Sequence, residues 1–531
     1  MSRNNVLFYM RPIGDAAKAV LKDPENAYLL DRASPDPRFA IGHFQSKSGS
    51  RTTLVTIGRN GDIVLRGNSY SREQCSFGVD PNTHVIMFYD DSSAGTSSVL
   101  GPDSMAIRPQ QPRKVVVQPD LNTMIGMGGV NRDLITFQLD WPFKSPATMK
   151  RIEQRDVKSL AQNPKFARTN SDNAVTAAPT MPQTRIHTSL PNRPMIRWAK
   201  IDGIGAGAFG EVNRAVDVDS GRLIAVKIIK IRRNQNQEAF FRLLKREVEA
   251  IGRIEHPFVV DYVCYQASIE SVEAQVVMGL MEGSLHSLLY DKEASPDRLN
   301  ATANTMLVHM LQALDCVASM GIVHRDVKPE NILYTYSLNR EIVFKLGDFG
   351  LCNHSAQAQS TAGTFIYMAP EILSAAQGQT PQADIWSLFM VLVWVYDFQG
   401  FRNANGAEFT VQTLLRLAQD ATAQGHKLEQ LKEMARPDPV KRASAAQMML
   451  KLSLFSNEPR AILCSHGKDP RRIPAIPVDV PPANPRRSSG QPQALGRSSG
   501  QALGRSQGVG SMSGDVKMTG ASLNYSSSRV A

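Results

Sequence analysis

The stretch that decides the fold of this chain is HRDVKPEN, residues 324–331. Asp326 can accept the proton of a hydroxyl group, and Lys328 can lie against a phosphoryl group in transit. Asn331, five residues after the aspartate, can reach a metal ion from the same loop. Seven specified residues in this order make a coincidental match rare, so the stretch predicts phosphoryl-transfer chemistry.

Two further motifs follow in the order that this chemistry needs. LGDFG, residues 346–350, supplies a second carboxylate, Asp348, and APE, residues 369–371, closes the intervening segment. Phosphoryl transfer needs charge neutralised around the moving group and two oxygens held roughly in line. A lysine, two carboxylates and an amide around Mg²⁺ would provide that neutralisation.

A glycine-rich stretch, GAGAFGEV, lies upstream at residues 205–212. Glycines lack a Cβ, so such a loop can close over phosphates and present its N–H groups to them, although this pattern alone is a weak signal. The β-type run IAVK, residues 224–227, then ends in Lys227. We expect Lys227 to hold phosphates while Glu247, on the following amphipathic helix, orients it; taken singly, both are more often ordinary surface charges.

With these motifs in order, residues from about 197 to 455 resemble a eukaryotic protein kinase domain, which implies a bilobal α+β fold. The resemblance implies Asp326 as the catalytic base, helped by Lys328, and a pair between Lys227 and Glu247. It implies ATP and Mg²⁺ as cofactors and phosphorylation of protein Ser or Thr. ATP would lie against Gly205, Gly207, Gly210, Val212, Ala225, Lys227, Met278 and Met281, and Mg²⁺ against Asn331 and Asp348.

Other residues match the kinase pattern or depart from it. Thr364 fits the substrate-docking loop of Ser/Thr kinases, Asp384 fits the DxWSxG motif, and Arg442 is expected to pair with Glu371. Phe389 stands where the family has glycine in DxWSxG. An inactive kinase-like fold is therefore the alternative reading of this region.

The resemblance also predicts regulation between Asp348 and Glu371. Arg325 precedes the catalytic aspartate, so a phosphate on the intervening loop could pair with it and order the segment. Ser360 and Thr361 are the regulatory candidates, with Ser355 behind them, although loops are often Ser-rich for solubility alone.

Residues 27–142 contain short β-rich runs separated by turn residues, which predicts an antiparallel β-sandwich. TIGRNGDIVL (56–65), YSREQC (70–75) and DSSAGT (91–96) occur among them. In this order the three stretches resemble a forkhead-associated (FHA) domain, which binds phosphothreonine peptides through loops at one end. By that resemblance Arg59 and Ser71 contact phosphate, with Arg72 nearby in the same phosphopeptide site. Gln74 replaces the family's structural histidine, and Ala94 replaces an asparagine that contacts the peptide.

The remaining regions are predicted from composition. Residues 1–26 are expected to be a flexible N-terminus, 143–194 a Pro-rich linker, 195–456 the kinase domain and 457–531 a disordered basic tail. From residue 458 onward ten Lys/Arg and four Asp/Glu give the tail a charge of +6, over half of the net +11 of the 531-residue chain. The architecture is multidomain.

Several functional classes are disfavoured by the sequence. Five scattered cysteines without a CxxC pair indicate thiols in a reducing compartment instead of disulfides or a zinc site. The N-terminus has no secretion signal, and the longest apolar run, residues 388–396, is too short to span a bilayer. We expect an intracellular protein without membrane partners; the nucleus is favoured and the cytoplasm is compatible. Nucleic-acid binding through the tail lacks aromatic interleaving.

Together the two resemblances match checkpoint-type kinases of the calmodulin-kinase-like group, which act in DNA-damage or meiotic signalling. Protein substrates with Ser/Thr acceptors and phosphothreonine-bearing proteins would be the partners. A phosphothreonine-reading scaffold with a slow or regulatory kinase-like domain is the alternative.

Overall fold

A computed structural model describes residues 6–42, 46–102, 104–109, 112–162, 195–207, 210–230, 237–268, 273–290, 295–337, 339–349, 365–374, 380–403, 409–454 and 461–478. The chain divides into a unit of residues 1–478 and a second unit of residues 479–531, none of which lies in the described ranges. Among the described residues, no helix is both long enough and apolar enough to cross a membrane.

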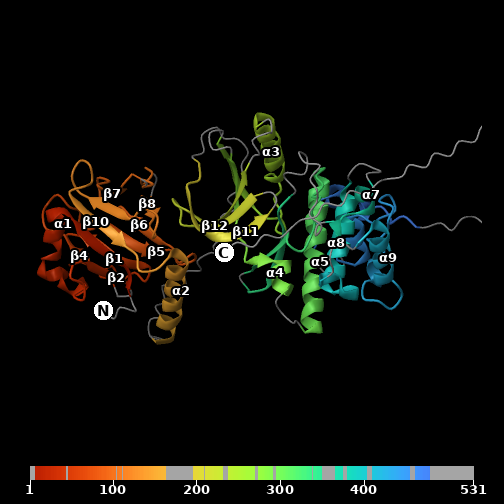
Figure 1. Ribbon diagram of the computed structural model, residues 1–531, viewed down its shortest axis with the longest axis horizontal. Helices are drawn as coiled ribbons and strands as arrows, with labels where there is room; N and C mark the ends of the chain where they lie inside the picture. The colour runs from red at the N-terminus through yellow and green to blue at the C-terminus, as the bar shows by residue number, and fades with distance from the viewer. Residues whose placement is uncertain are drawn as a thin grey trace, which may run out of the picture. The chain divides into compact units, whose positions relative to one another are not determined.

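The N-terminal region consists of two five-stranded sheets that share one hydrophobic core (Figure 1). The first sheet has the order β2-β1-β10-β9-β7 and comprises β1 (Val6–Ile13), β2 (Phe39–Gly42), β7 (Ser97–Leu100), β9 (Met124–Met127) and β10 (Ile135–Asp140). The second has the order β4-β3-β5-β6-β8 and comprises β3 (Thr53–Gly58), β4 (Ile63–Val64), β5 (Cys75–Val79), β6 (Ile86–Tyr89) and β8 (Lys114–Val116).

Aromatic side chains from both sheets meet in this core. Phe8 of β1 lies 5.0 Å from Phe77 of β5, ring centre to ring centre, and Phe77 lies 5.2 Å from Phe88 of β6. All three are fully buried. Such contacts add to the stability that area burial already gives, so they help to fix one sheet against the other.

The described strands of the two N-terminal sheets pair antiparallel with one exception. The exception is β3 and β4, which pair in parallel over two residues. The sheets of this region are therefore antiparallel, as the sequence predicted, apart from this two-residue pairing. The short chain between β3 and β4 turns back on itself through Gly61, where a Cβ would lie 2.8 Å from Gly58 N. This tight loop brings β4 alongside β3, the strand that precedes it in the chain.

The expectation of a flexible N-terminus is wrong for the described residues 6–26. β1 lies between β2 and β10 in its sheet, and α1 (Gly14–Leu21) and the 3₁₀ helix η2 (Pro24–Leu29) follow it. Tyr9 of β1 is paired with Asp140 of β10, at the far end of the module. Local sequence cannot show a pairing across that separation.

The predicted linker also begins with regular structure. Residues Ser145–Gln162 form the helix α2, so the flexible-linker prediction is wrong for these residues. Residues 163–194 lie outside the described ranges.

The second half of the described chain has a strand-rich part and a helical part (Figure 1). The antiparallel sheet β11-β12-β13-β15-β14 comprises β11 (Trp198–Gly207), β12 (Gly210–Asp217), β13 (Leu223–Lys230), β14 (Tyr262–Ser268) and β15 (Glu273–Gly279), with α3 (Gln237–Ile251) contacting β14. The helical part contains α4 (Leu285–Tyr290), α5 (Pro296–Ser319), α7 (Pro370–Leu373), α8 (Pro381–Val395), α9 (Val411–Ala421) and α10 (Ala445–Lys451). Its small sheet comprises β16 (Gly283–Ser284), β17 (Ile332–Tyr336) and β18 (Ile342–Leu346), and its 3₁₀ helices are η5 (Phe398–Asn403), η7 (Glu429–Leu431), η8 (His466–Lys468) and η9 (Pro470–Arg472).

Helix α5 is the long central element of the helical part. Ser295 caps it by accepting a hydrogen bond from Arg298 N, and Pro296 occupies its first turn, where no N–H donor is needed. Its apolar face, with Met306, Met310 and Leu314 at helical spacing, is buried. α8, which is buried almost throughout, contacts it. Together these helices fix the base on which the HRDVKPEN loop is built.

Candidate active site

The glycine-rich stretch forms the hairpin between β11 and β12, in which Gly207 pairs with Gly210 and Gly205 with Val212. Gly210 has a φ of 141°, and a Cβ there would lie 2.0 Å from the carbonyl oxygen of Ile228. Only glycine fits this position. Residues 208 and 209 lie outside the described ranges.

Sheet register brings together three of the predicted ATP contacts, Val212, Ala225 and Met278. Ala225 of β13 pairs directly with Met278 of β15, and both side chains are buried. Val212 of β12 pairs with Lys227, which lies two residues along β13 from Ala225. Met281 follows β15 and is partly buried against the same core. These residues form an apolar wall below the glycine-rich hairpin.

Lys227 forms an ion pair with Asp348, and the ion pairs of the described residues do not include the predicted pair between Lys227 and Glu247. Lys227 is almost fully buried on β13, whereas the Asp348 side chain is 41% exposed. Glu247 lies on α3, where burial raises its pKa to about 7 and the charge of Arg325 lowers it. On α3, Glu247 is therefore close enough to Arg325 to feel its positive charge. Lys227 pairs instead with Asp348, which follows β18 in the chain.

The catalytic-loop prediction is matched by a compact cluster. Asp326 Oδ2 accepts hydrogen bonds from Lys328 Nζ and Asn331 Nδ2, each at 2.8 Å. Asn331 Nδ2 also donates to the Asp326 backbone oxygen at 2.7 Å. Asp326 Oδ1 is buried and has no hydrogen-bond partner among the described residues. One carboxylate oxygen is therefore held in place while the other can accept a proton donor.

A metal ion would find oxygen donors beside this cluster. The Asn331 amide nitrogen is committed to Asp326, so its amide oxygen is the atom that can bind a cation. Gly347 N donates to the Asn331 backbone oxygen at 2.9 Å, which places Asp348 next to Asn331. Amide and carboxylate oxygens are ligands that Mg²⁺ prefers. The residues present fit the predicted magnesium site.

A buried carboxylate, that of Asp384, holds the backbone of the HRDVKPEN loop. Asp384 of α8 accepts hydrogen bonds from His324 N at 2.8 Å and Arg325 N at 2.9 Å. Arg325 adopts a φ of 70°, a conformation that is costly for a non-glycine residue. Burial raises the pKa of Asp384, and its hydrogen bonds with His324 and Arg325 oppose that rise. Asp384 thus holds the strained backbone immediately before Asp326.

Comparison with known proteins decides the identity of this region. A family model described as a protein kinase domain matches residues 198–453. Residues 198–453 therefore have the fold of a protein kinase domain.

The relatives of this kinase domain include serine/threonine kinases. Serine/threonine-protein kinase SSK22 of Saccharomyces cerevisiae is 30% identical over 228 residues, 39% of this chain and 16% of that protein. Mitogen-activated protein kinase kinase kinase 2 of Arabidopsis thaliana is 34% identical over 214 residues, 38% of this chain and 31% of that protein. CBL-interacting serine/threonine-protein kinase 9 of Arabidopsis thaliana is 30% identical over 263 residues, 46% of this chain and 55% of that protein. The chain covers less than two thirds of each.

Aromatic rings connect the two parts of the kinase domain behind Asp348. Phe349 is buried and lies 4.5 Å from the ring of His324 and 6.1 Å from that of Tyr262 on β14. Burial raises the pKa of Tyr262, so this hydroxyl is neutral. Sequence reasoning named His324 and Phe349 within their motifs but gave no role to Tyr262, because only the fold brings β14 to them.

The predicted pair between Glu371 and Arg442 is confirmed. Arg442 Nη1 and Nη2 donate to the two carboxylate oxygens of Glu371 at 2.7 and 2.9 Å, and both side chains are buried. Arg442 also donates to the backbone oxygens of Gln382 and Pro437. Phe389, which replaces the family's glycine, is fully buried in α8 and packs into the core of the kinase domain. The substitution adds core volume without touching the catalytic cluster.

The predicted phosphate contacts of the sandwich lie on adjoining loops. Arg59 N donates to Ser71 O at 3.0 Å and Asn60 N to Arg72 O at 2.9 Å. Ser93 N donates to Ser71 Oγ at 3.4 Å. Arg59 and Arg72 are exposed. Three loops therefore converge at one end of the sandwich and present two guanidinium groups and a hydroxyl there.

Gln74 organises these loops from the interior. Its Oε1 accepts a hydrogen bond from Ser71 N at 3.0 Å, and its Nε2 donates to Thr96 Oγ1 and Ser97 Oγ at 2.8 Å. The residue is fully buried. A glutamine thus links the loop that carries Ser71 to the loop that ends at Thr96, at the position where the FHA resemblance predicts a histidine.

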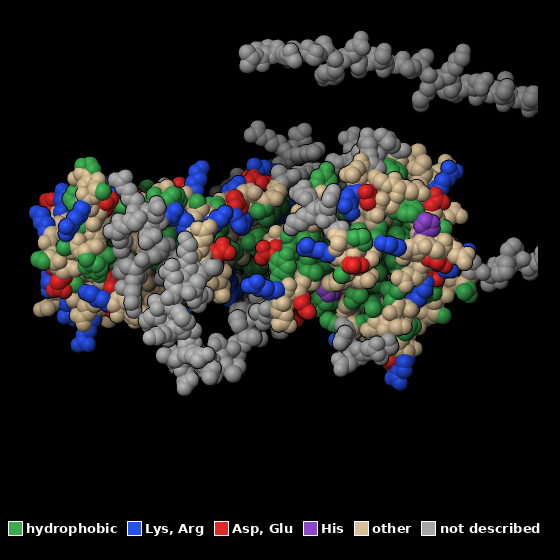
Figure 2. Space-filling view, turned by 90° about the horizontal axis from the view of Figure 1, so that it is seen from below, with side chains coloured by type: hydrophobic (Ala, Val, Ile, Leu, Met, Phe, Trp, Pro, Cys, Tyr) green, Lys and Arg blue, Asp and Glu red, His purple; other side chains and the backbone are tan. Residues whose placement is uncertain are grey.

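Some predicted residues fall outside the described ranges. Ser355, Ser360, Thr361 and Thr364 are among them. The described residues contain no group of three or more His, Cys, Asp or Glu side chains placed to hold a metal. On the face seen in Figure 2, the Lys and Arg side chains of the described residues are interspersed with Asp and Glu.

Proposed function

We propose that this protein is a serine/threonine kinase that transfers the γ-phosphate of ATP to protein Ser or Thr side chains. The observation that supports this most directly is the cluster around Asp326. Its Oδ2 is fixed by Lys328 and Asn331, while its buried Oδ1 has no partner among the described residues. A fixed carboxylate whose second oxygen has no hydrogen-bond partner among the described residues is suited to bind an acceptor hydroxyl.

Each of these residues has its own role in phosphate transfer. Asp326 Oδ1 orients the acceptor hydroxyl and takes its proton, and Lys328 balances charge on the transferred group. Bound Mg²⁺ would neutralise charge on the phosphates. Asn331 and Asp348 would hold it through amide and carboxylate oxygens. Gly205, Gly207 and Gly210 allow the backbone of the hairpin to approach the nucleotide, and Ala225 and Met278 present an apolar surface to its base.

Binding of Mg²⁺-ATP requires Lys227 to exchange partners. In the structure Lys227 pairs with Asp348, the same carboxylate that would hold the metal. Once Asp348 turns to the cation, Lys227 is left for the phosphates, and Glu247 on α3 is the carboxylate that could then orient it. We infer that a Lys227–Glu247 pair replaces the Lys227–Asp348 pair on activation.

Phosphorylation would favour that exchange. A phosphate on Ser360 or Thr361 could pair with Arg325, whose charge acts on Glu247 in the structure. Removing Arg325 from Glu247 would free that carboxylate for Lys227. Replacing both hydroxyl residues by alanine should lower peptide phosphorylation severalfold in the protein treated with ATP. Equal turnover of the double variant and the parent would contradict this regulation.

We also propose that the N-terminal sandwich binds phosphothreonine peptides, as its resemblance to FHA domains implies. The convergence of the Arg59, Ser71 and Arg72 loops supports this, because guanidinium and hydroxyl groups there can donate to phosphate oxygens. Docking on a phosphorylated partner would raise the local concentration of the kinase domain near its substrates. The resemblance to checkpoint-type kinases gives the nucleus and DNA-damage or meiotic signalling as the proposed setting, which imaging of the tagged protein would test.

A peptide-library assay tests both parts at once. The purified full chain is incubated with Mg²⁺-ATP and Ser-, Thr- and Tyr-containing peptides, and phosphorylated positions are identified by mass spectrometry. Phosphate on Ser and Thr is the expected result. Nucleotide binding without phosphate transfer would instead favour the alternative, a phosphothreonine-reading scaffold. In parallel, immobilised phosphothreonine peptides should retain the parent chain and release an Arg59→Ala variant.

A further inference from the structure

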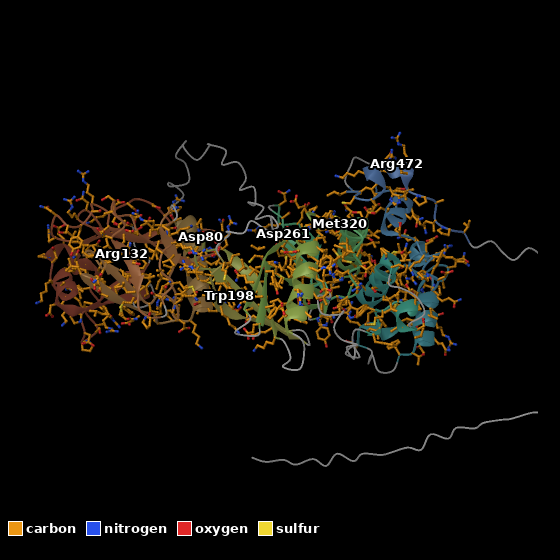
Figure 3. The ribbon with its side chains drawn as sticks, turned by 90° about the horizontal axis from the view of Figure 1, so that it is seen from above. Asp80, Arg132, Trp198, Asp261, Met320 and Arg472 are labelled. Atoms are coloured by element: carbon orange, nitrogen blue, oxygen red, sulfur yellow. The ribbon has the colours of Figure 1, made fainter. Side chains whose placement is uncertain are left out.

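The part of the chain after the kinase domain match packs against the helical part of that domain. The match ends at residue 453, but residues 461–478 are described, and Arg472 within them is labelled in Figure 3. Ala461, Leu463 and Ile473 are buried in the same core as α5 and α10. The prediction of a disordered tail from residue 457 is therefore wrong for residues 461–478, which we call the C-terminal strap.

Hydrogen bonds fix the strap at both ends. Gln447 Nε2 of α10 donates to the backbone oxygens of Pro474 and Ala475, each at 3.0 Å. At the other end Gln312 Oε1 of α5 accepts from Ile462 N at 2.6 Å. Composition could not show this, because the strap is held by side chains of distant helices and not by its own regular structure.

The closest attachment is to Asp315 of α5. Its Oδ2 accepts from Cys464 N at 2.8 Å and Ser465 N at 3.0 Å, and its Oδ1 accepts from Ser465 Oγ at 2.5 Å. Asp315 is buried. Three hydrogen bonds to one buried carboxylate hold the backbone of Cys464 against the turn of α5 that carries the next residue, Cys316.

The two thiols meet at this attachment. Cys316 is 5% exposed and Cys464 is half-buried, and both are free cysteines in the structure. A hydrogen bond from the Cys316 thiol lowers the pKa of Cys464, and Lys468 adds to that effect, while the same hydrogen bond raises the pKa of Cys316. Cys464 is therefore the more acidic thiol of the pair and the more accessible one, the combination that makes a cysteine reactive.

We propose that Cys316 and Cys464 are an oxidisable pair whose disulfide fastens the C-terminal strap to α5. Hydrogen peroxide is the oxidant. The Cys464 thiolate attacks one peroxide oxygen, the O–O bond breaks, and after protonation the products are a sulfenic acid and water. The Cys316 thiol then attacks the Cys464 sulfur, and its proton and the hydroxyl leave as a second water. Two thiols lose two electrons and peroxide gains them.

The disulfide would act on the strap more than on the catalytic loop. In the reduced protein, opening of residues 461–478 costs only the local hydrogen bonds and apolar contacts. A covalent bond at residue 464 prevents that opening and closes a loop of well over a hundred residues back to α5. Loop closure of this size stabilises a fold substantially, and a rise in melting temperature of about 5 °C is expected for a domain of this size.

Peptide mapping of the full chain tests the pair directly. The reduced protein is treated with hydrogen peroxide, its remaining thiols are alkylated, and it is digested without reduction. The expected result is a peptide that joins Cys316 to Cys464, absent from the untreated sample. Any of three results would overturn the proposal. After peroxide treatment both cysteines could still be alkylated, Cys464 could be oxidised only to sulfinic acid, or Cys316 could be linked to a different cysteine.

Serine variants separate the pair from general thiol chemistry. Cys464→Ser and Cys316→Ser should each abolish the linked peptide and the rise in melting temperature. Cys75→Ser, which alters a fully buried thiol in β5 of the sandwich, should retain both. Circular dichroism of the reduced variants confirms that each is folded. A temperature rise that persists in Cys464→Ser would show that another modification causes it.

Discussion

The ammonium group of Lys227 lies in contact with the carboxylate of Asp348, two residues that the chain separates by 121 positions. Both are proposed to serve Mg²⁺-ATP binding, yet in the structure they pair with each other. The contact leaves Glu247 in an environment where burial raises its pKa to about 7. The proposed exchange of partners therefore begins from a defined pair that mutation and titration can probe.

The first prediction concerns pH and Glu247. Its pKa is about 7 in the folded protein and near 4.5 when unfolded, so the stability it contributes is full below pH 4.5 and is lost as the pH rises through 7. The stability of the parent relative to Glu247→Gln should fall by about 1 kcal/mol across this range, because solvent screening reduces the effect at a half-exposed site. Urea unfolding at pH 5 and pH 8 measures it. A difference that does not change with pH would contradict the burial of this carboxyl.

The second prediction separates two glycines of one motif. A Cβ at Gly210 would overlap the carbonyl oxygen of Ile228, whereas a Cβ at Gly205 would meet nothing within 4 Å. Gly210→Ala should displace β12 from β13, destabilise the protein by about 1–3 kcal/mol and raise the apparent KM for ATP. Gly205→Ala is the matched control and should change unfolding little. Equal destabilisation of the two variants in thermal unfolding would count against the hairpin geometry.

A third prediction concerns the buried pair of Glu371 and Arg442. Arg442→Met removes one partner and leaves a buried carboxylate uncompensated, which should cost about 3–5 kcal/mol of stability. Adding Glu371→Gln should recover part of that loss. Lys245→Ala removes an exposed pair with Glu249 on α3 and should cost less than about 0.5 kcal/mol. Chemical denaturation of the four proteins checks this order, and a loss at Arg442 no larger than at Lys245 would refute it.

The fourth prediction addresses Gln74. Gln74→Ala removes three hydrogen bonds that join the loops of Ser71 and Thr96, so phosphothreonine-peptide binding should weaken by about tenfold or more. Glu73→Ala, at the exposed neighbouring position, should bind as the parent does. Fluorescence anisotropy with a labelled phosphothreonine peptide and its unphosphorylated form provides the comparison. Parent-like affinity of the Gln74 variant would mean that the loops hold their geometry without it.

Sequence predicted the parts of this structure that are encoded locally. Asp326, Lys328 and Asn331 lie within six residues, so one turn of chain brings them together. The Arg442–Glu371 pair could be predicted only because the family resemblance supplied it. The sheet position of β1, the attachment of the strap and the partner of Lys227 depend on contacts between distant segments. The sequence offers two candidate carboxylates for Lys227, Glu247 and Asp348, and only the folded structure shows that Asp348 pairs with it.

The central claim is that Asp326 receives the acceptor hydroxyl. The most direct measurement is the rate of phosphate transfer from Mg²⁺-ATP to a Ser/Thr peptide by the parent chain and by Asp326→Asn, which keeps the side chain's shape. The account predicts that transfer falls by about 100-fold or more while nucleotide affinity and phosphothreonine binding stay within about twofold. Transfer by the variant at the parent's rate would contradict it.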